Sequence, residues 1–162
     1  MTDIENKIMD CARMILAQDG YLAPMAFECA TMVPIQLDFS TDEDKFYSLT
    51  KLGYAAYMAK VPALYILSNG AMRRFKDDKE VSYVLENWDT EQPDTYPQKM
   101  RTEAIVLWKL TFPDTLAIHV LEYTMDDKKY LFKDLFSVDS AIRSDFTEMV
   151  KMGWKKAQKE KT

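Results

Sequence analysis

Apolar residues near the start of the chain recur every three or four positions, which is the spacing of one helix face. These positions are Ile4, Ile8, Cys11, Ala12, Ile15 and Leu16. Thr2 and Glu5 can form a capping box, in which each side chain accepts a hydrogen bond from a free backbone N–H at the helix start. Gly20 can end the helix in a left-handed conformation, which costs glycine little. The pattern predicts a first helix that ends at Gly20.

The next two segments alternate apolar with small or polar side chains, as strands with one buried face do. The apolar positions are Met25, Phe27 and Cys29 in the first segment and Ile35, Leu37 and Phe39 in the second. A turn near Thr31 would join them into an antiparallel hairpin. Pro24 and Pro34 lack the N–H that strand pairing needs, so we expect open ends or one open edge here.

A second stretch of helical spacing follows the polar segment Ser40–Asp44. This segment supplies a cap and the negative charge that a helix N-terminus favours. The helix should extend to about Ala59, because Pro62 disfavours the helical conformation just before it. Gly53 and the alanines near it leave one helix face without bulky side chains, which we call the thin face. It predicts a close approach of this helix to a sheet.

Further apolar segments indicate three or four more strands. Residues 63–68 should form a central buried strand that ends in a turn or bulge at Asn69-Gly70. Residues 102–112 and 116–123 should form a hairpin around Pro113-Asp114, and 130–136 a further strand. Ser137 to Ser140 should then cap a last helix. The apolar face of that helix would carry Ile142, Phe146, Met149, Val150 and Trp154.

Short connections between these elements favour antiparallel neighbours. The sequence therefore predicts one α+β domain over residues 1–162, with a mostly antiparallel sheet of five to six strands and three helices. This element order resembles the profilin-like group of folds, including roadblock and longin domains. Such folds serve scaffolding, dimerisation and ligand sensing alike, so the resemblance implies a topology and no particular function.

The segment 76–99 interrupts the pattern, because it is acidic and contains two prolines between two predicted strands. Its apolar residues at helical spacing are Val81, Val84, Leu85 and Trp88. Loops of roughly twenty residues are uncommon in compact domains. We expect an insertion with a short helix that acts as a lid, reaches a partner or covers a sheet edge. Tyr83, Trp88 and Tyr96 are its candidate contacts.

The composition narrows the classes of partner. Of the 162 residues, 48% are hydrophobic, which is enough for one substantial core. The net charge of −5 argues against broad binding to nucleic acid, which needs clustered Lys and Arg. The lysine-rich segment 151–161 is expected to be a solvated helix end, with an acidic lipid or nucleic acid as the alternative partner. No apolar run approaches the roughly 20 residues of a membrane span.

The first residues are acidic and open directly into a helix, which is untypical of a signal peptide. We therefore expect a cytoplasmic protein that binds neither membrane nor nucleic acid. Cys11 and Cys29 do not form a disulfide framework, and both are expected to be small buried hydrophobic side chains.

No known catalytic or cofactor motif occurs in the chain. His119 is the only histidine, which excludes a zinc site with several histidines, and the four glycines form no phosphate-binding loop. The acidic clusters are expected to be solvated turns and caps. His119 is expected to be satisfied on the sheet face, with pairing to a nucleophilic Cys29 as the alternative if their strands meet. We predict no cofactor, no metal and no catalytic residue.

Aromatic side chains are the remaining candidates for contact with a partner, because they combine apolar area with a polar group. Trp154 lies in an otherwise polar helical segment, which makes it the best single candidate for contact with a second subunit. The 11 methionines are expected to fill the core, although methionine also suits adaptable binding surfaces.

The segment 19–27 reads Asp-Gly-Tyr-Leu-Ala-Pro-Met-Ala-Phe, and the buried strand 64–68 reads Leu-Tyr-Ile-Leu-Ser. With the second helix between them, they are similar to a group of uncharacterised small prokaryotic and phage-type proteins. In that group the buried strand ends in a Ser-Glu-x-Trp-like turn. Here residues 68–72 read Ser-Asn-Gly-Ala-Met, without the acidic and aromatic positions. The resemblance covers about the first half of the chain and implies no known activity.

Three functions remain open on the sequence. The first is a non-enzymatic interaction or dimerisation module, expected to be a homodimer, with His119 and Trp154 among its contacts. The second is a small-ligand binder or sensor with segment 76–99 as its lid. The third is an enzyme of unrecognised type centred on His119, Cys29 or the acidic turns.

Overall fold

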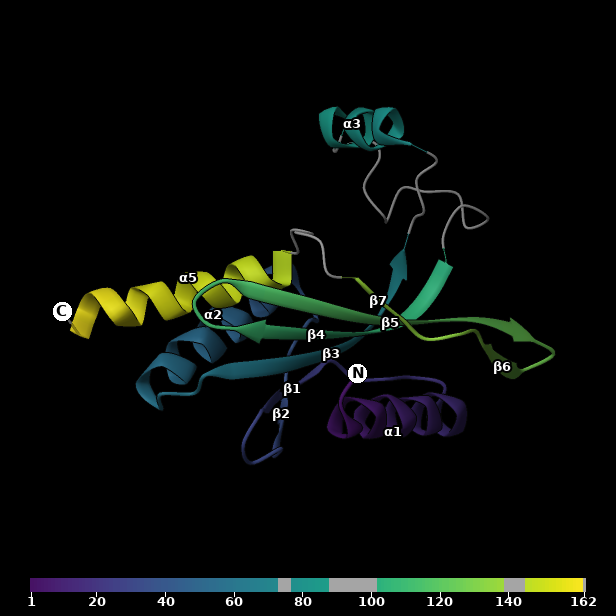
Figure 1. Cartoon of the computed structure of the whole chain (residues 1–162), viewed down its shortest axis with the longest axis horizontal. Helices are drawn as coiled ribbons and strands as arrows, with labels where there is room; N and C mark the ends of the chain where they lie inside the picture. Colours follow the sequence, from purple (N-terminus) through teal and green to yellow (C-terminus); the bar gives the residue numbers. More distant parts are fainter. Residues whose placement is uncertain (73–76, 88–101, 139–144, 162) are drawn as a thin grey trace.

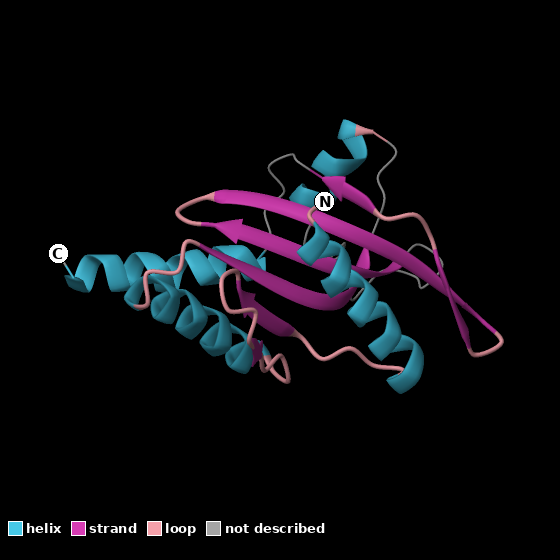
Figure 2. Ribbon diagram, turned by 60° about the horizontal axis from the view of Figure 1, so that its bottom comes forward, coloured by secondary structure: helices cyan, strands magenta, loops and turns pink. Residues whose placement is uncertain are grey.

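The computed structural model describes residues 1–72, 77–87, 102–138 and 145–161, in which helices cover both faces of one sheet (Figures 1 and 2). The helices are α1 (Asp3–Asp19), α2 (Asp42–Met58), α3 (Asp78–Glu86) and α5 (Asp145–Lys161). The strands are β1 (Met25–Glu28), β2 (Pro34–Gln36), β3 (Ala63–Met72), β4 (Thr102–Thr111), β5 (Thr115–Asp126), β6 (Lys129–Phe132) and β7 (Phe136–Val138).

The sheet has seven strands in the order β2-β1-β3-β4-β5-β6, and β7 pairs with the first half of β5. All of these pairings are antiparallel. The predicted α+β class with a mostly antiparallel sheet is confirmed. The described residues contain a fourth helix, α3, where the sequence predicted three and a short helical stretch in the insertion.

The two faces of the sheet carry separate apolar cores, because successive side chains of a strand point to opposite faces. On β3, Tyr65 and Leu67 point to the face that α1 covers. Leu64 and Ile66 point to the opposite face, under α2 and α5. The arrangement is a three-layer molecule with α1 on one side and the α2–α5 pair on the other (Figure 1).

The ends of α1 follow the local sequence as predicted. The Thr2 hydroxyl accepts from the Glu5 N–H at 3.2 Å, and the Glu5 carboxylate accepts from the Thr2 N–H at 2.8 Å. Gly20 ends the helix with φ of 68°. The first hairpin is also confirmed, and β2 lies at one edge of the sheet with Pro34 in it.

The thin face of α2 contacts another helix, not the sheet as the sequence suggested. A Cβ at Gly53 would overlap the carbonyl of Val150, and a Cβ at Gly153 would overlap the carbonyl of Thr50. The backbones of α2 and α5 therefore touch where these two glycines meet. The apolar face of α2 that lies on the sheet carries Leu49, Leu52 and Ala56.

Two predicted boundaries are wrong. Asn69 and Gly70 do not form a turn; they continue β3 and pair with Ile105 and Ala104, because β4 extends as far as β3 does. Ser137 does not cap the last helix either. It lies in β7, opposite His119 on β5, and α5 begins at Asp145.

The described part of segment 76–99 is α3, which confirms the predicted short helix. Figure 1 shows it apart from the three layers, beyond the end of β3. Tyr83 is 54% exposed on it. Trp88 and Tyr96 lie outside the described residues, and so does Ile142. In the ranges that the structure covers, no helix is long and apolar enough to cross a bilayer.

Candidate functional site

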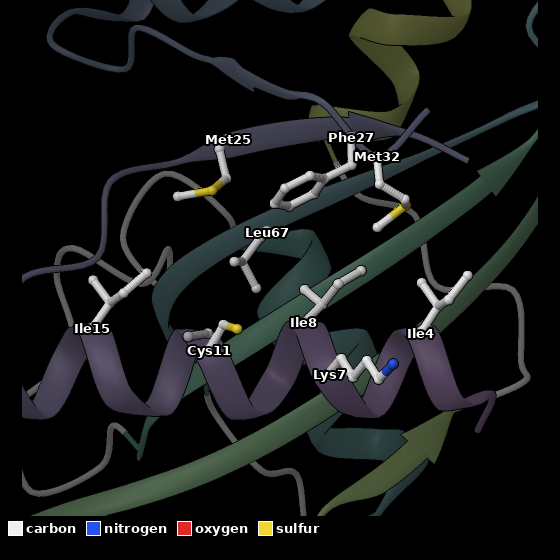
Figure 3. A pocket seen from close by; sticks show the side chains of 10 residues that line it. Ile4, Lys7, Ile8, Cys11, Ile15, Met25, Phe27, Met32 and Leu67 are labelled. Atoms are coloured by element: carbon white, nitrogen blue, oxygen red, sulfur yellow. The ribbon is translucent and has the colours of Figure 1, made fainter. Parts of the chain in front are cut away.

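An open apolar pocket lies between α1 and the sheet, with a volume of about 290 Å³. Figure 3 shows α1 side chains on one side of the pocket, β1 and Met32 on the other, and Leu67 of β3 between them. We call this the apolar pocket. Its lining residues are Ile4, Lys7, Ile8, Cys11, Ala12, Ile15, Met25, Phe27, Met32 and Leu67.

The pocket exists because α1 presents a wider apolar face than the sheet covers. Ile8, Met9, Ala12 and Leu16 are buried against β3, β4 and β5. Ile4 and Cys11 belong to the same apolar face but lie toward the short strand β1, where less of the sheet lies opposite them. Ile4 is 44% exposed and Cys11 is exposed. The prediction that Cys11 is buried is therefore wrong.

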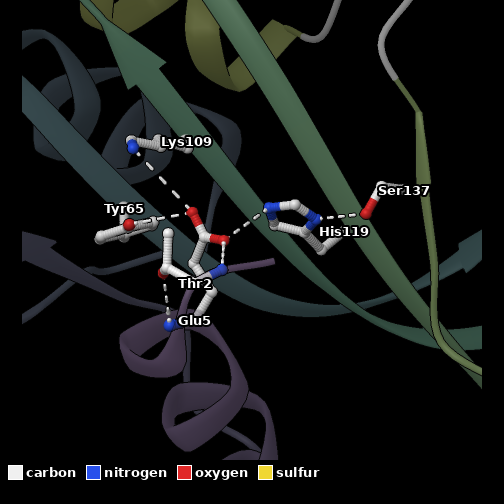
Figure 4. Close-up of polar contacts among 6 residues, drawn as sticks. All are labelled: Thr2, Glu5, Tyr65, Lys109, His119 and Ser137. Atoms are coloured by element: carbon white, nitrogen blue, oxygen red, sulfur yellow. Dashed lines mark hydrogen bonds and ion pairs between the residues drawn. The ribbon is translucent and has the colours of Figure 1, made fainter.

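Next to this pocket, a buried polar cluster holds the first turn of α1 to the sheet (Figure 4). Its centre is Glu5, which is only 4% exposed. Glu5 Oε1 accepts a hydrogen bond from the Tyr65 hydroxyl at 3.1 Å and lies 3.9 Å from Lys109 Nζ. Glu5 Oε2 lies 3.4 Å from His119 Nε2. Each oxygen of the buried carboxylate thus has partners from the sheet.

His119 connects Glu5 to the edge strand β7. Its Nδ1 lies 2.7 Å from the hydroxyl of Ser137, the residue opposite it in the strand register. With the ring proton on Nε2, the imidazole donates to Glu5 and accepts from Ser137. His119 is 7% exposed, so both ring nitrogens are satisfied inside the protein, as expected for a histidine on the sheet face.

The cluster changes the acidity of its members. Burial raises the pKa of Glu5, but the Thr2 N–H, the Tyr65 hydroxyl, the charge that His119 carries when its ring is protonated, and the charge of Lys109 outweigh burial, so the pKa is lowered. Burial and the neighbouring Glu5 carboxylate raise the pKa of Tyr65 to about 12. At neutral pH the cluster therefore consists of an ionised carboxylate and a neutral phenol.

Cys29 does not pair with His119, because β3 and β4 lie between the strands that lead to these residues. Burial raises the pKa of the half-buried Cys29 thiol, and the Glu28 and Glu5 carboxylates act in the same direction against Lys109. An active cysteine nucleophile needs the opposite shift, because the thiolate is the reactive form. The suggested Cys29–His119 nucleophile pair is therefore wrong.

The contacts lead from Ser137 to His119 and from His119 to Glu5. This is the order of nucleophile, base and orienting carboxylate in a catalytic triad. The same contacts can also have a structural role, because they attach β7, β5 and α1 to each other. Ser137 does not line the apolar pocket, and it does not line the cavity between the C-terminal ends of α2 and α5. We interpret this chain of contacts as the attachment of α1. Among the described residues, no three His, Cys, Asp or Glu side chains are placed to share a metal ion.

The three predicted site residues that the structure describes lie apart from one another. His119 lies in the polar cluster, Tyr83 is on α3, and Trp154 is half-buried on the opposite face of the sheet, against Phe112. Sequence reasoning took Glu5 only as a cap and missed Tyr65, Lys109 and Ser137. One signal was available: Glu5 is three and four positions before Ile8 and Met9, so its carboxylate falls on the buried face of α1.

Comparison with known proteins gives no relative: no family model, no curated protein and no solved structure matches this chain.

Proposed function

We propose that this chain is a binding protein for a small, uncharged, apolar molecule, which it takes in the apolar pocket. The observation that carries the proposal is the surface of that pocket, which is almost entirely carbon and sulfur yet open to the outside. Ligand sites are typically concave and mostly apolar. The proposal keeps the small-ligand function suggested by the sequence, with a pocket between the sheet and a helix, and it does not use segment 76–99 as a lid.

The size of the pocket limits the ligand. A cavity of about 150 Å³ with apolar walls can hold one benzene molecule. The apolar pocket is about 290 Å³, which suits two fused or linked rings or a chain of similar size. Met25 and Met32 can adapt to either shape, because methionine has three rotatable bonds and a polarisable sulfur.

The walls also limit the charge of the ligand. A buried ionised group without a partner is costly. Lys7 is the only charged residue in the lining, and Figure 3 shows its ammonium group turned along α1, away from Leu67. A ligand that fills the pocket therefore gains free energy from its apolar surface, at about 25 cal/mol per Å² buried.

The neutral fluorescent probe Prodan, which is built on two fused rings, tests this proposal by titration. We expect its fluorescence to rise on binding to the parent protein and the melting temperature to increase with probe concentration. Cys11→Phe places a ring in the exposed mouth of the pocket and should weaken binding at least about tenfold, because the probe loses most of its space.

Met14→Phe is the matched control. Met14 is on the same helix and 59% exposed, but it is not part of the pocket, so this variant should bind the probe as the parent does. Equal affinities of the Cys11→Phe and Met14→Phe variants would contradict the proposal, and so would a parent protein that does not bind the probe.

A second candidate function is self-association, which the exposed apolar residues beside the edge strand favour. Val33 is 61% exposed and Ile35 43% exposed, and all three residues of β2 are exposed. Edge strands of this kind can pair with a second copy, although Pro34 removes one donor from this edge. A homodimer through β2 would cover these side chains.

Light scattering over a concentration series tests the homodimer. A dimer through β2 should become a monomer in Ile35→Lys. It should persist in the control Leu131→Lys, which changes an exposed apolar residue on the opposite edge strand, β6. A parent protein that remains monomeric over the whole series would exclude this second candidate.

A further inference from the structure

A second cavity, of about 430 Å³, lies on the opposite face of the sheet between the C-terminal ends of α2 and α5. We call it the aromatic cleft. It shares no lining residue with the apolar pocket. The lining residues that bear on its chemistry are Tyr57, Lys60, Phe112, Trp154 and Lys161.

The cleft follows from the way the two helices meet. The backbones of α2 and α5 touch at Gly53 and Gly153. Both helices then run toward the same end of the molecule and separate (Figure 1). The space between their last turns is closed on the sheet side by Val61, Pro62 and Phe112. The Phe112 N–H donates to the Pro62 carbonyl at 3.0 Å, which fixes this end of the sheet.

Three aromatic rings line the cleft, and the rings of Phe112 and Tyr57 both contact the ring of Trp154. The rings of Phe112 and Trp154 are stacked, with centroids 5.4 Å apart and planes 4° apart. Tyr57 meets Trp154 edge-on at 5.2 Å. Each ring is half-buried, so the cleft has flat apolar walls that are already in place. Such walls favour a flat ring, because aromatic pairs gain from stacked and edge-to-face geometry.

Two lysines bring positive charge to the same cleft. Both Lys60 and Lys161 are exposed, and in the described ranges no carboxylate lies within ion-pair distance of either. Lys60 has a φ of 57°, a left-handed conformation that glycine or asparagine usually supplies after a helix. The chain thus has a lysine at a position where its backbone conformation is unfavourable.

The helix ends limit where an anion can lie. The C-terminal ends of α2 and α5 carry partial negative charge, which repels an anion placed between them. An anionic group is therefore favoured only at the two ammonium groups on the rim. A ring is favoured deeper in the cleft, against the aromatic walls.

We propose that the aromatic cleft binds a small aromatic anion, with its ring against Trp154 and Phe112 and its carboxylate between Lys60 and Lys161. This ligand differs from that of the apolar pocket in charge, so the two sites can be tested separately.

Naphthalene-2-carboxylate and the neutral 2-naphthalenemethanol form a matched pair of probes, and calorimetry measures their affinities. In the Cys11→Phe background, where the apolar pocket is filled and cannot take the neutral alcohol, the protein should bind the carboxylate more tightly than the alcohol. The double variant Lys60→Gln, Lys161→Gln should lose about tenfold in affinity for the carboxylate, because two charge contacts are removed. Its affinity for the alcohol should stay within about twofold, because the aromatic walls remain.

Two controls separate this site from other effects. Lys128→Gln with Lys129→Gln makes the same change in net charge at the exposed β5–β6 turn and should leave both affinities unchanged. Cys11→Phe, which fills the apolar pocket, should also leave carboxylate binding unchanged. Equal affinity for acid and alcohol in the Cys11→Phe background, no effect of the Lys60 and Lys161 changes, loss of binding in Cys11→Phe, or no binding at all would each overturn the proposal.

Discussion

The Glu5 side chain has two functions in one turn of helix. It caps α1 through the Thr2 N–H, and it is the buried carboxylate to which Tyr65 and His119 attach. A buried charge is stable only when it is paired and hydrogen-bonded. The first turn of α1, which lies beside the apolar pocket, is therefore attached to the sheet through this carboxylate, in addition to the apolar core under the helix.

Glu5→Gln should lower the free energy of unfolding at neutral pH by about 1–3 kcal/mol, because charge-assisted hydrogen bonds are replaced by neutral ones. The pKa of Glu5 is lowered in the folded protein. Its contribution is therefore present above its unfolded pKa and lost as the pH falls through the lower, folded value. The difference between parent and variant should shrink on acidification.

Urea unfolding at neutral pH and at several acidic pH values measures this difference. Asp10→Asn is the control, because Asp10 is an exposed carboxylate on the same helix. A difference between parent and Glu5→Gln that stays constant down to the acid unfolding transition would contradict the role given to the ionised carboxylate.

The residues of the polar cluster show the limit of sequence reasoning. His119 could be placed on a buried strand face from its apolar neighbours, and that placement is correct. Its partners could not be found, because Glu5 and Ser137 belong to two other elements far from His119 in the chain. Only the strand register places Ser137 opposite His119, and a polar serine before a helix reads equally well as a cap.

At the scale of elements, the contact between α2 and α5 depends on two absent side chains. Gly53→Ala would place a methyl group inside the carbonyl of Val150. We expect a loss of about 3 kcal/mol or more, at the upper end of overpacking effects, because the obstacle is backbone and cannot rotate away.

Thermal or urea unfolding measures this effect. Gly70→Ala is the matched control: it is the same substitution in strand β3, where nothing lies within 4 Å of the new Cβ. Gly70→Ala should be neutral or slightly stabilising, since glycine weakens a strand interior. Similar losses in both variants would show that the close helix contact is not the cause.

Most elements were predictable because their apolar periodicity is regular and their ends are marked. Thr2, Gly20 and Pro62 gave correct helix boundaries. The errors come from contacts between elements. Asn69-Gly70 is typical of a turn, but ten residues of β4 pair with β3 through that point. Gly53 was correctly identified as a close contact, but the sequence does not tell a helix partner from a sheet partner.

At the scale of the whole molecule, the three layers are unequally attached. The α2–α5 pair shares one core with the sheet and has direct contact between its two backbones. Among the described helices, α1 is the one that covers the other face (Figure 2), and it lies next to an open pocket. Elements that pack alone open more easily than central strands.

Hydrogen exchange should therefore show the amides of α1 exchanging faster than those in the middle of β3, β4 and β5. Exchange measured by mass spectrometry tests this order. Glu5→Gln should accelerate exchange in α1 more than in the sheet, and Prodan bound in the apolar pocket should slow exchange in α1. Protection of α1 equal to that of β4 would contradict this picture of an independently opening layer.

The glycine contact also has a geometric consequence for the aromatic cleft. Because α2 and α5 touch within one helical turn of Tyr57 and Trp154, the distance between their last turns depends on the angle at which they cross. A small change in that angle would widen or narrow the gap between Lys60 and Lys161 without altering any residue in it. The size of molecule that fits in the aromatic cleft is thus determined at Gly53 and Gly153, which have no side chain.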